Sequence, residues 1–245
     1  MRLRSCTLAI ALVAGGLVAN AGRAGAEAAA ATAIMVARYG FDGGSGAVRD
    51  NSGNGHTLKV VAGHGGAVHA IAHGTGRALA FPAKCTAKAA RGCPHVVLQT
   101  PGAADLNPGA KPLAYGAAVL LAKTQTTKGQ NVVQKGYSAT GSQYKLQIDG
   151  VAGRPSCVLV DDRKPTIRLV RSAGSVADGA WHTIECRRAG ASLSILVDGV
   201  RRGALKIPAT LSVANTGPLS VGGKGAYPDN DQFQGALDNV WVSVG

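Results

Sequence analysis

Aromatic side chains, acidic side chains and long apolar runs are all scarce in this sequence of 245 residues. Beyond the N-terminal region, no apolar run approaches the roughly 18 residues that a membrane-spanning helix requires, so we expect no transmembrane segment in the body of the chain. The sequence has only 2 Trp, 5 Tyr and 3 Phe, against 35 Gly and 10 Pro. This balance argues against a helical bundle and favours one globular domain of short strands joined by turns.

Glutamate is the scarcest charged residue, because Glu27 and Glu185 are the only two in the sequence. Glycosidases generally need two carboxylates about 5 to 9 Å apart across the scissile bond. The adjacent pair Asp161–Asp162 precedes Arg163–Lys164, and strand or turn geometry would aim its two side chains apart. We therefore expect a solvated turn at this point and not a catalytic pair.

Motifs for other hydrolytic or metal chemistry are missing as well. No Gly-x-Ser-x-Gly elbow leads into a helix, so a hydrolase triad has no support. His64, His69 and His73 lie among glycines that would break a helix, and exposed histidines on a loop and a strand are favoured over a zinc or copper site. The sequence thus predicts a protein that is not an enzyme.

The N-terminus has the pattern of a secretory signal peptide. Arg2 and Arg4 precede an apolar stretch over Cys6–Ala19, and a small-residue cleavage motif follows at Ala24–Ala26. A membrane anchor is the alternative, but the apolar stretch is short for one. We expect residues 1–26 to be the signal peptide, 27–33 a disordered leader and 34–245 the folded domain of a secreted, extracellular protein. Cleavage would remove three arginines and no acid, which lowers the formal charge from +13 to 23 − 13 = +10.

Four cysteines follow the expected cleavage site: Cys85, Cys93, Cys157 and Cys186. An even number in an exported chain indicates two disulfides, for which three pairings are possible. We favour Cys85 with Cys93, which would close a short loop, and Cys157 with Cys186, which would join two strand-like segments. No Cys-x-x-Cys pair is present, so a structural zinc site is disfavoured.

Apolar and β-branched runs recur along the chain between clusters of Gly, Pro, Asn and Asp. This spacing predicts an all-β sandwich or barrel. Asp149–Gly150 and Asp198–Gly199 each stand between apolar residues and predict type I′ hairpin turns. The expected strands lie at about 35–41, 58–62, 78–81, 96–99, 113–121, 131–134, 144–148, 157–160, 167–170, 181–187, 193–197, 219–221 and 234–244.

Alternation within two of these strands predicts which side chains face the core. His182, Ile184 and Cys186 share one face, so we expect a disulfide inside the sandwich and a packed, hydrogen-bonded histidine. Asp238 shares its parity with the three valines of the last strand. A carboxylate in line with valines needs a partner, because burial of an unpaired charge is costly.

Seven short motifs occur in a defined order: Tyr39–Asp42, Asp50–Gly55, Ala78–Phe81, Asp178–His182, Leu193–Gly199, Leu219–Gly223 and Phe233–Val240. Their order resembles the laminin G-like, or concanavalin A-like lectin/glucanase, jelly roll. The resemblance runs from about residue 35 to the C-terminus and implies an all-β, two-sheet antiparallel jelly-roll sandwich. Residues 84–111 match least well, and we expect them to be an insertion that carries its own disulfide.

The resemblance also bears on metal binding and on catalysis. Many members of this superfamily hold a structural calcium ion with an aspartate of the last strand and groups near the first strand. By that resemblance Asp238 is the first ligand candidate and Asp42 the second, since calcium takes hard oxygen ligands. Hydrogen bonds from backbone amides of a neighbouring turn are the alternative partner for Asp238. The Glu-x-Asp-x-Glu pattern of the superfamily's glucanases is absent.

The first hypothesis for function is a secreted, non-catalytic module that binds a polysaccharide or glycoconjugate, as the resemblance implies. Sugar recognition needs an exposed aromatic face beside polar groups. Tyr227, Asp229 and Asn230 lie in one polar loop, and Trp241 falls on the face opposite the core valines. These four residues are the candidate glycan site.

The positive charge supports a second hypothesis, electrostatic binding of anionic polymers. Arg187 with Arg188 and Arg201 with Arg202 are the candidate residues, and the two pairs would be neighbours if their strands adjoin. No nucleic-acid-binding fold or interleaved aromatic pattern is present, so nucleic acid is not the expected partner. A protein-interaction or adhesion module of the cell envelope is the third hypothesis, because fold does not determine function.

Overall fold

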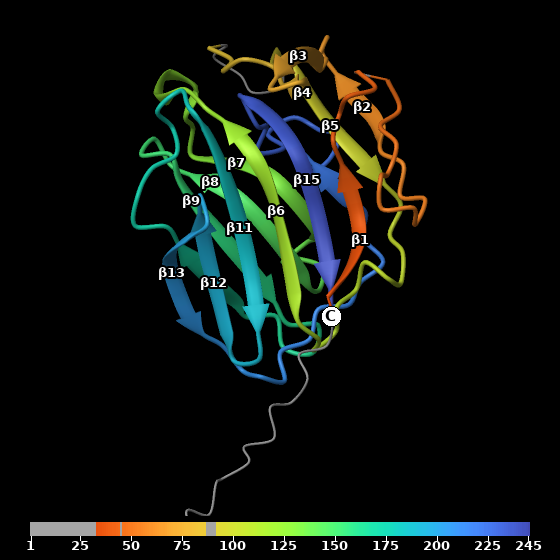
Figure 1. Ribbon diagram of the computed structural model, residues 1–245, viewed down its shortest axis with the longest axis vertical. Coiled ribbons are helices and arrows are strands. Elements are labelled where there is room, and N and C mark those ends of the chain that lie inside the picture. The colour runs from red at the N-terminus through yellow and green to blue at the C-terminus, as the bar shows by residue number, and fades with distance from the viewer. Residues whose placement is uncertain (1–32, 45, 87–91) are drawn as a thin grey trace, which may run out of the picture. The chain divides into compact units, whose positions relative to one another are not determined.

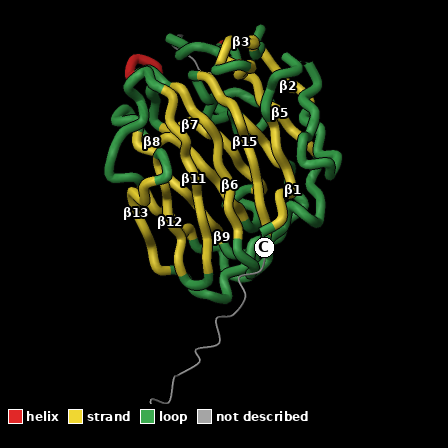
Figure 2. Tube along the Cα trace, viewed as in Figure 1, coloured by secondary structure: helices red, strands yellow, loops and turns green. Residues whose placement is uncertain are grey.

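The computed structural model describes residues 33–44, 46–86 and 92–245, which form an all-β sandwich of two antiparallel sheets (Figure 1). The predicted fold class is therefore confirmed. The only helical element among the described residues is the short turn η2 (Lys123–Gln125), drawn red in Figure 2. The expected signal peptide, residues 1–26, lies outside the described residues, as does the expected leader except for Ala33.

The sheet nearer the viewer in Figure 1, here called the front sheet, has eight strands. They are β1 (Ile34–Tyr39), β3 (His69–His73), β4 (Gly76–Ala80), β6 (Leu113–Leu120), β11 (Trp181–Ala189), β12 (Ser192–Val197), β13 (Val200–Lys206) and β15 (Ala236–Val244). Their hydrogen-bonded order is β13-β12-β11-β6-β15-β4-β3. β4 pairs with the start of β15 and β1 with the rest of it, so β15 is central to this sheet.

The back sheet has seven strands and supplies the other half of the core. They are β2 (Lys59–Gly63), β5 (His95–Thr100), β7 (Gly129–Gly136), β8 (Gln143–Asp149), β9 (Arg154–Val160), β10 (Ile167–Arg171) and β14 (Leu219–Val221). Their order is β10-β9-β8-β7-β14-β5-β2. β5 lies between β14 and β2 and puts Val96 and Leu98 into the core, so the expectation that residues 84–111 are an insertion is wrong.

Each predicted apolar run contains part of an observed strand, whereas β3 and β13 lie outside the predicted runs. β13 reads Val-Arg-Arg-Gly-Ala-Leu-Lys, which is mostly exposed and has few of the β-branched and aromatic residues typical of strands. It forms because it pairs with β12 at the edge of the front sheet. Pairing therefore overrides a weak local preference.

Both predicted hairpins are confirmed, but only the one at Asp198–Gly199 has the predicted type I′ turn. Asp198 and Gly199 both have the positive φ that a type I′ turn requires, 52° and 74°, and the flanking Val197 and Val200 pair with each other. In the other hairpin, β8 and β9 pair antiparallel as predicted, but Asp149 pairs with Arg154. A longer turn therefore replaces the type I′ turn predicted at Asp149–Gly150.

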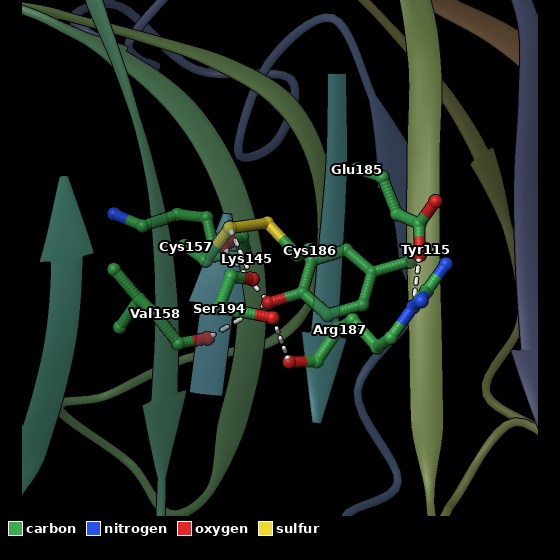
Figure 3. Close-up of a disulfide and its surroundings, with 8 residues drawn as sticks. All are labelled: Tyr115, Lys145, Cys157, Val158, Glu185, Cys186, Arg187 and Ser194. Atoms are coloured by element: carbon green, nitrogen blue, oxygen red, sulfur yellow. Dashed lines mark hydrogen bonds and ion pairs between the residues drawn. A yellow bond between two sulfur atoms is a disulfide. The ribbon is translucent and has the colours of Figure 1, made fainter. Parts of the chain in front are cut away.

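The inner faces of the two sheets pack into one apolar core that is crossed by polar and covalent links. Tyr115 of β6 reaches through it, and its hydroxyl lies 3.2 Å from the backbone oxygens of both Lys145 and Val158 in the back sheet. Both predicted disulfide pairings are confirmed. Cys157 of β9 and Cys186 of β11 are fully buried and join the two sheets next to Tyr115, as Figure 3 shows.

We predict that the double variant Cys157→Ala/Cys186→Ala loses about 3–4 kcal/mol of unfolding free energy in urea titrations, since this disulfide closes a loop of 29 residues. Cys85→Ala/Cys93→Ala is the matched control, because its bond spans only 8 residues and is expected to contribute about 1 kcal/mol less. Equal losses in the two variants, or a larger loss in the control, would contradict the expectation that loop length sets the difference.

Candidate functional site

The outer face of the front sheet carries a hollow of about 500 Å³. It is the best-formed candidate for a binding site because aromatic and polar side chains from four strands converge on it, over Ala118 of a fifth strand. The aromatic residues are His73 of β3 and Trp181 of β11, with Trp241 of β15. The remaining lining residues are Met35, Arg38, Ala118, His182, Thr183 and Asn239.

Small residues of β6 form the floor between the two tryptophans. Thr183 pairs with Ala118 across the β11–β6 ladder, and Trp241 pairs with Gly116 across the β15–β6 ladder. A Cβ at Gly116 would lie 3.2 Å from the indole Nε1 of Trp241. Glycine at this position therefore lets the indole lie close to the sheet, half-buried and open to the hollow.

A β-bulge in β15 decides how its side chains enter the site. The register between β15 and β6 shifts between Asp238 and Trp241, and Asn239 has a φ of 45°, in the left-handed region. Leu237 packs into the core before the bulge and Val240 after it. The expectation that Asp238 lies in line with the core valines is therefore wrong, because the extra residue reverses the alternation.

Asp238 is turned to the outer face, where it holds a histidine in place. Its Oδ2 lies 2.6 Å from Nδ1 of His73, and its Oδ1 accepts a hydrogen bond from the backbone amide of Asn239. The His73 ring stacks on the Trp181 indole with centroids 3.9 Å apart and 21° between the planes. Asp238 thus positions an aromatic stack at one end of the hollow.

Both residues of the expected calcium site already have hydrogen-bond partners. Asp238 has its carboxylate engaged by His73 and Asn239, and Asp42 accepts a hydrogen bond from the backbone amide of Arg77 at 2.9 Å. In the part of the chain that the structure describes, no three His, Cys, Asp or Glu residues gather to hold a metal ion. Calcium binding through Asp42 and Asp238 stays a prediction that these contacts do not support.

His182 is packed and hydrogen-bonded, as the sequence predicts. Its Nδ1 lies 2.8 Å from Asp198 in the β12–β13 turn, and its Nε2 lies 3.1 Å from the carboxylate of Asp178 in the loop before β11. Burial alone would lower the pKa of His182, but the hydrogen bonds and charges of Asp198 and Asp178 outweigh it, so the pKa is raised. This pair of contacts ties two loops to the strand that carries Trp181.

The predicted glycan residues fall into two separate places. Trp241 lines the hollow just described, whereas Asp229 and Asn230 line a second one of about 280 Å³ beside the Cys85–Cys93 disulfide. Asn230 is fully buried and donates a hydrogen bond to the Gly225 oxygen, so its role there is structural.

The loop that carries these residues offers one exposed aromatic side chain. Tyr227 is 43% exposed, and Asp229 forms a surface ion pair of 3.1 Å with Lys128. Neither residue lines the hollow that contains Trp241. The candidates of the Tyr227 loop and Trp241 therefore lie in separate places, and a role for each in glycan binding stays a prediction.

The predicted arginine cluster is not assembled either. β12 lies between β11 and β13, so the strands of the two arginine pairs do not adjoin. Arg188 is buried, and its guanidinium donates to the backbone oxygens of Gly109 and Ala209. Arg187 pairs with Glu185 at 2.6 Å, which leaves Arg201 and Arg202 as exposed arginines on β13.

Of the nine residues that line the hollow, only Trp241 belongs to the predicted site, and Arg38, Trp181 and Asn239 are among those that were missed. Arg38 stands between two core residues of β1, and Trp181 has the parity opposite to that of Ile184 and Cys186, so strand alternation could have marked both as outward-facing. Their approach to Trp241 depends on the strand order β11-β6-β15 and on β1 pairing with β15, which local patterns do not contain.

Comparison with known families gives one sequence match. Residues 100–244, more than half of the chain, match the laminin G family model described as the Concanavalin A-like lectin/glucanases superfamily. A search of curated proteins finds no relative by sequence. Among the residues placed in the structure, no helix is long and apolar enough to span a membrane.

Solved structures with a similar fold include toxin binding domains and a domain of an arabinanase. Domain 4 of AbnA, a GH43 extracellular arabinanase from Geobacillus stearothermophilus solved with arabinotriose, superposes with a TM-score of 0.65 at 14% identity, covering 87% of this chain and 93% of that one. The binding domain of Paraclostridial Mosquitocidal Protein 1 superposes with a TM-score of 0.62 at 13% identity, and the match covers 85% of this chain and 48% of that one.

The binding domain of Botulinum Neurotoxin DC, solved in complex with SialylT, gives a TM-score of 0.55 at 8% identity, covering 86% of this chain and 48% of that one. The chain thus spans about half the length of the two toxin domains. At these identities the likeness shows the fold alone.

We predict that His182→Gln lowers the unfolding free energy more at about pH 6 than at about pH 9. The folded-state pKa is raised above the unfolded value near 6.5, so the stabilisation is fully present below that value and is lost as pH rises through the folded pKa. Urea titrations of the two proteins at both pH values measure the gap. His69→Gln, at an exposed position of β3, is the control; a gap for His182→Gln that does not change with pH would contradict the prediction.

Proposed function

This chain belongs to the Concanavalin A-like lectin/glucanases superfamily, and on that premise we propose that it is a secreted, non-catalytic module that binds glycans. The observation that carries the proposal is the pair of half-buried tryptophans, Trp181 and Trp241, that flank a hollow of about 500 Å³ on the front sheet. The ligand class is a polysaccharide or glycoconjugate.

The geometry of the hollow suits a sugar ring. An indole offers a large, rigid apolar face with little conformational freedom to lose, and the C–H face of a pyranose or furanose ring can stack on it. Thr183 and Asn239 supply hydroxyl and amide groups between and beside the two indoles. A few polar groups that converge on an apolar concave surface are typical of a small-ligand site.

The carboxylates near the hollow support binding without hydrolysis. Asp238 is held by His73, and Asp178 and Asp198 both face His182, so these acids are engaged in positioning contacts. Among the described residues, no carboxylate lines the hollow itself, whereas glycoside hydrolysis by the usual route needs two across the bond. The similar solved structures named above are two toxin binding domains and an arabinanase domain in complex with arabinotriose, which agrees with this function at the level of fold.

Secretion is part of the proposal. Two disulfides occur in the folded domain, and such bonds persist in oxidising compartments outside the cytosol. The signal-like pattern of the first 26 residues points the same way. An adhesion or protein-interaction role in the cell envelope is the competing function, and it would be favoured if a defined envelope protein bound while no glycan did.

We predict that Trp241→Ala and Trp181→Ala each weaken binding to a recognised glycan by about tenfold or more, since stacking on one aromatic ring contributes about 1–3 kcal/mol in nucleic-acid complexes. Screening the protein against a panel of polysaccharides, followed by calorimetry on the positives, measures the change. Tyr227→Ala is the matched control, because it removes an exposed aromatic side chain outside this hollow. Loss of binding in the Tyr227 variant with both tryptophan variants unaffected would transfer the site to the Tyr227 loop.

A further inference from the structure

The side chains around the hollow offer more hydrogen-bond donors than acceptors, and this difference indicates which class of glycan the hollow can bind. The described lining side chains include the Arg38 guanidinium, with five N–H donors, and the two indole N–H groups. The Thr183 hydroxyl and the Asn239 amide oxygen can accept hydrogen bonds, but no aspartate or glutamate of the described part of the chain lines the hollow. Sugar hydroxyl groups donate as well as accept, so a neutral glycan needs acceptors from the protein. A site lined mainly by donors is better matched by a ligand that brings its own acceptors.

Arg38 carries the positive charge of this site. Its side chain is exposed on the outer face of β1, and no carboxylate among the residues that the structure describes lies within ion-pair distance of its guanidinium. The nearby acids are already paired: Asp238 with His73, and Glu185 with Arg187. The Arg38 guanidinium is therefore available to a ligand.

The position of Arg38 links charge recognition to stacking. Arg38 pairs with Trp241 across the β1–β15 ladder, so cation and indole are adjacent on one face of the sheet. An acidic sugar carries its carboxylate on the edge of the ring, while the ring itself can stack on an aromatic surface. Arginine binds carboxylates through two parallel hydrogen bonds, which gives both orientation and affinity.

We propose that the hollow between Trp181 and Trp241 recognises a glycan through an acidic sugar whose carboxylate is held by Arg38. This inference rests on the proposed function and adds the ligand class to it. The recognised unit is a uronic or sialic acid. The net charge, +13 for the whole sequence and +10 after the proposed removal of residues 1–26, assists encounter with such polymers, and Arg38 supplies the specific contact.

The test compares polygalacturonate, alginate and sialyllactose with the carboxyl-reduced form of each, using the full secreted chain and calorimetry. Wild-type protein is expected to bind at least one acidic probe, and to bind its reduced form about tenfold or more weakly. Arg38→Gln is expected to lower the affinity for that acidic probe by about 10- to 100-fold, since a charge-assisted hydrogen bond is worth about 1.5–3 kcal/mol. Its affinity for the reduced form should fall much less, so that the variant binds the two forms with similar affinity.

Two controls separate this inference from the proposed function. Arg77→Gln makes the same charge change at an exposed position of β4 and is expected to bind like wild type. Trp241→Ala is expected to lose binding to both forms of the glycan. Dextran sulfate tests whether sulfate replaces carboxylate, and Arg38-dependent binding that is tighter to sulfate than to every carboxylate probe would overturn the proposal.

The remaining outcomes are also decisive. Equal binding of acidic and reduced glycans that Arg38→Gln leaves intact would overturn the acidic-sugar inference while the glycan-binding function stands. Binding of a neutral glycan through Trp241, with no acidic probe bound, would overturn that inference in the same way. Absence of binding to every glycan in the panel would overturn both proposals.

Discussion

The structure depends on the burial of the inner faces of the two sheets against each other. Every strand that contributes to this core commits alternate side chains to it, as Ile184 and Cys186 of β11 do. Only the intervening positions are left for binding, and Trp181 and Thr183 occupy two of them. The core and the candidate site therefore depend on the same strand register. A shift of a strand by one residue would turn its core side chains outward and its binding side chains inward.

Local alternation explains why most of the fold could be predicted. Most strands could be predicted from residues close together in the sequence, and the disulfides from the number and positions of the cysteines. The outward position of Trp241 follows from the alternation of side chains along its strand alone. The position of Asp238 could not be predicted, because the β-bulge that follows it adds a residue to one strand and leaves no mark in the pattern of apolar residues. The hollow depends on which strands pair, and that order is set by long-range contacts.

Histidine–aspartate pairs give the candidate site its rigidity. Asp238 fixes His73, whose ring stacks on Trp181, while Asp178 and Asp198 fix His182 in the adjacent position of β11. Because these side chains are already held in place, less of their conformational entropy is lost when a ligand binds. The sequence suggests a metal ligand for Asp238 and a turn former for Asp198. In the structure, these two aspartates also orient the imidazole rings of His73 and His182.

The arginines of β13 have a further consequence. β13 is the last strand of the front sheet, and its outer edge is only partly covered, by a backbone hydrogen bond from Ala173 to the Arg202 oxygen. The rest of this edge can meet another extended chain. Exposed long cationic side chains on such an edge, here Arg201, Arg202 and Lys206, repel a second copy that approaches with the same charges. A β-sandwich of this kind can therefore stay dispersed at high concentration, with its aromatic face left open to a polymer.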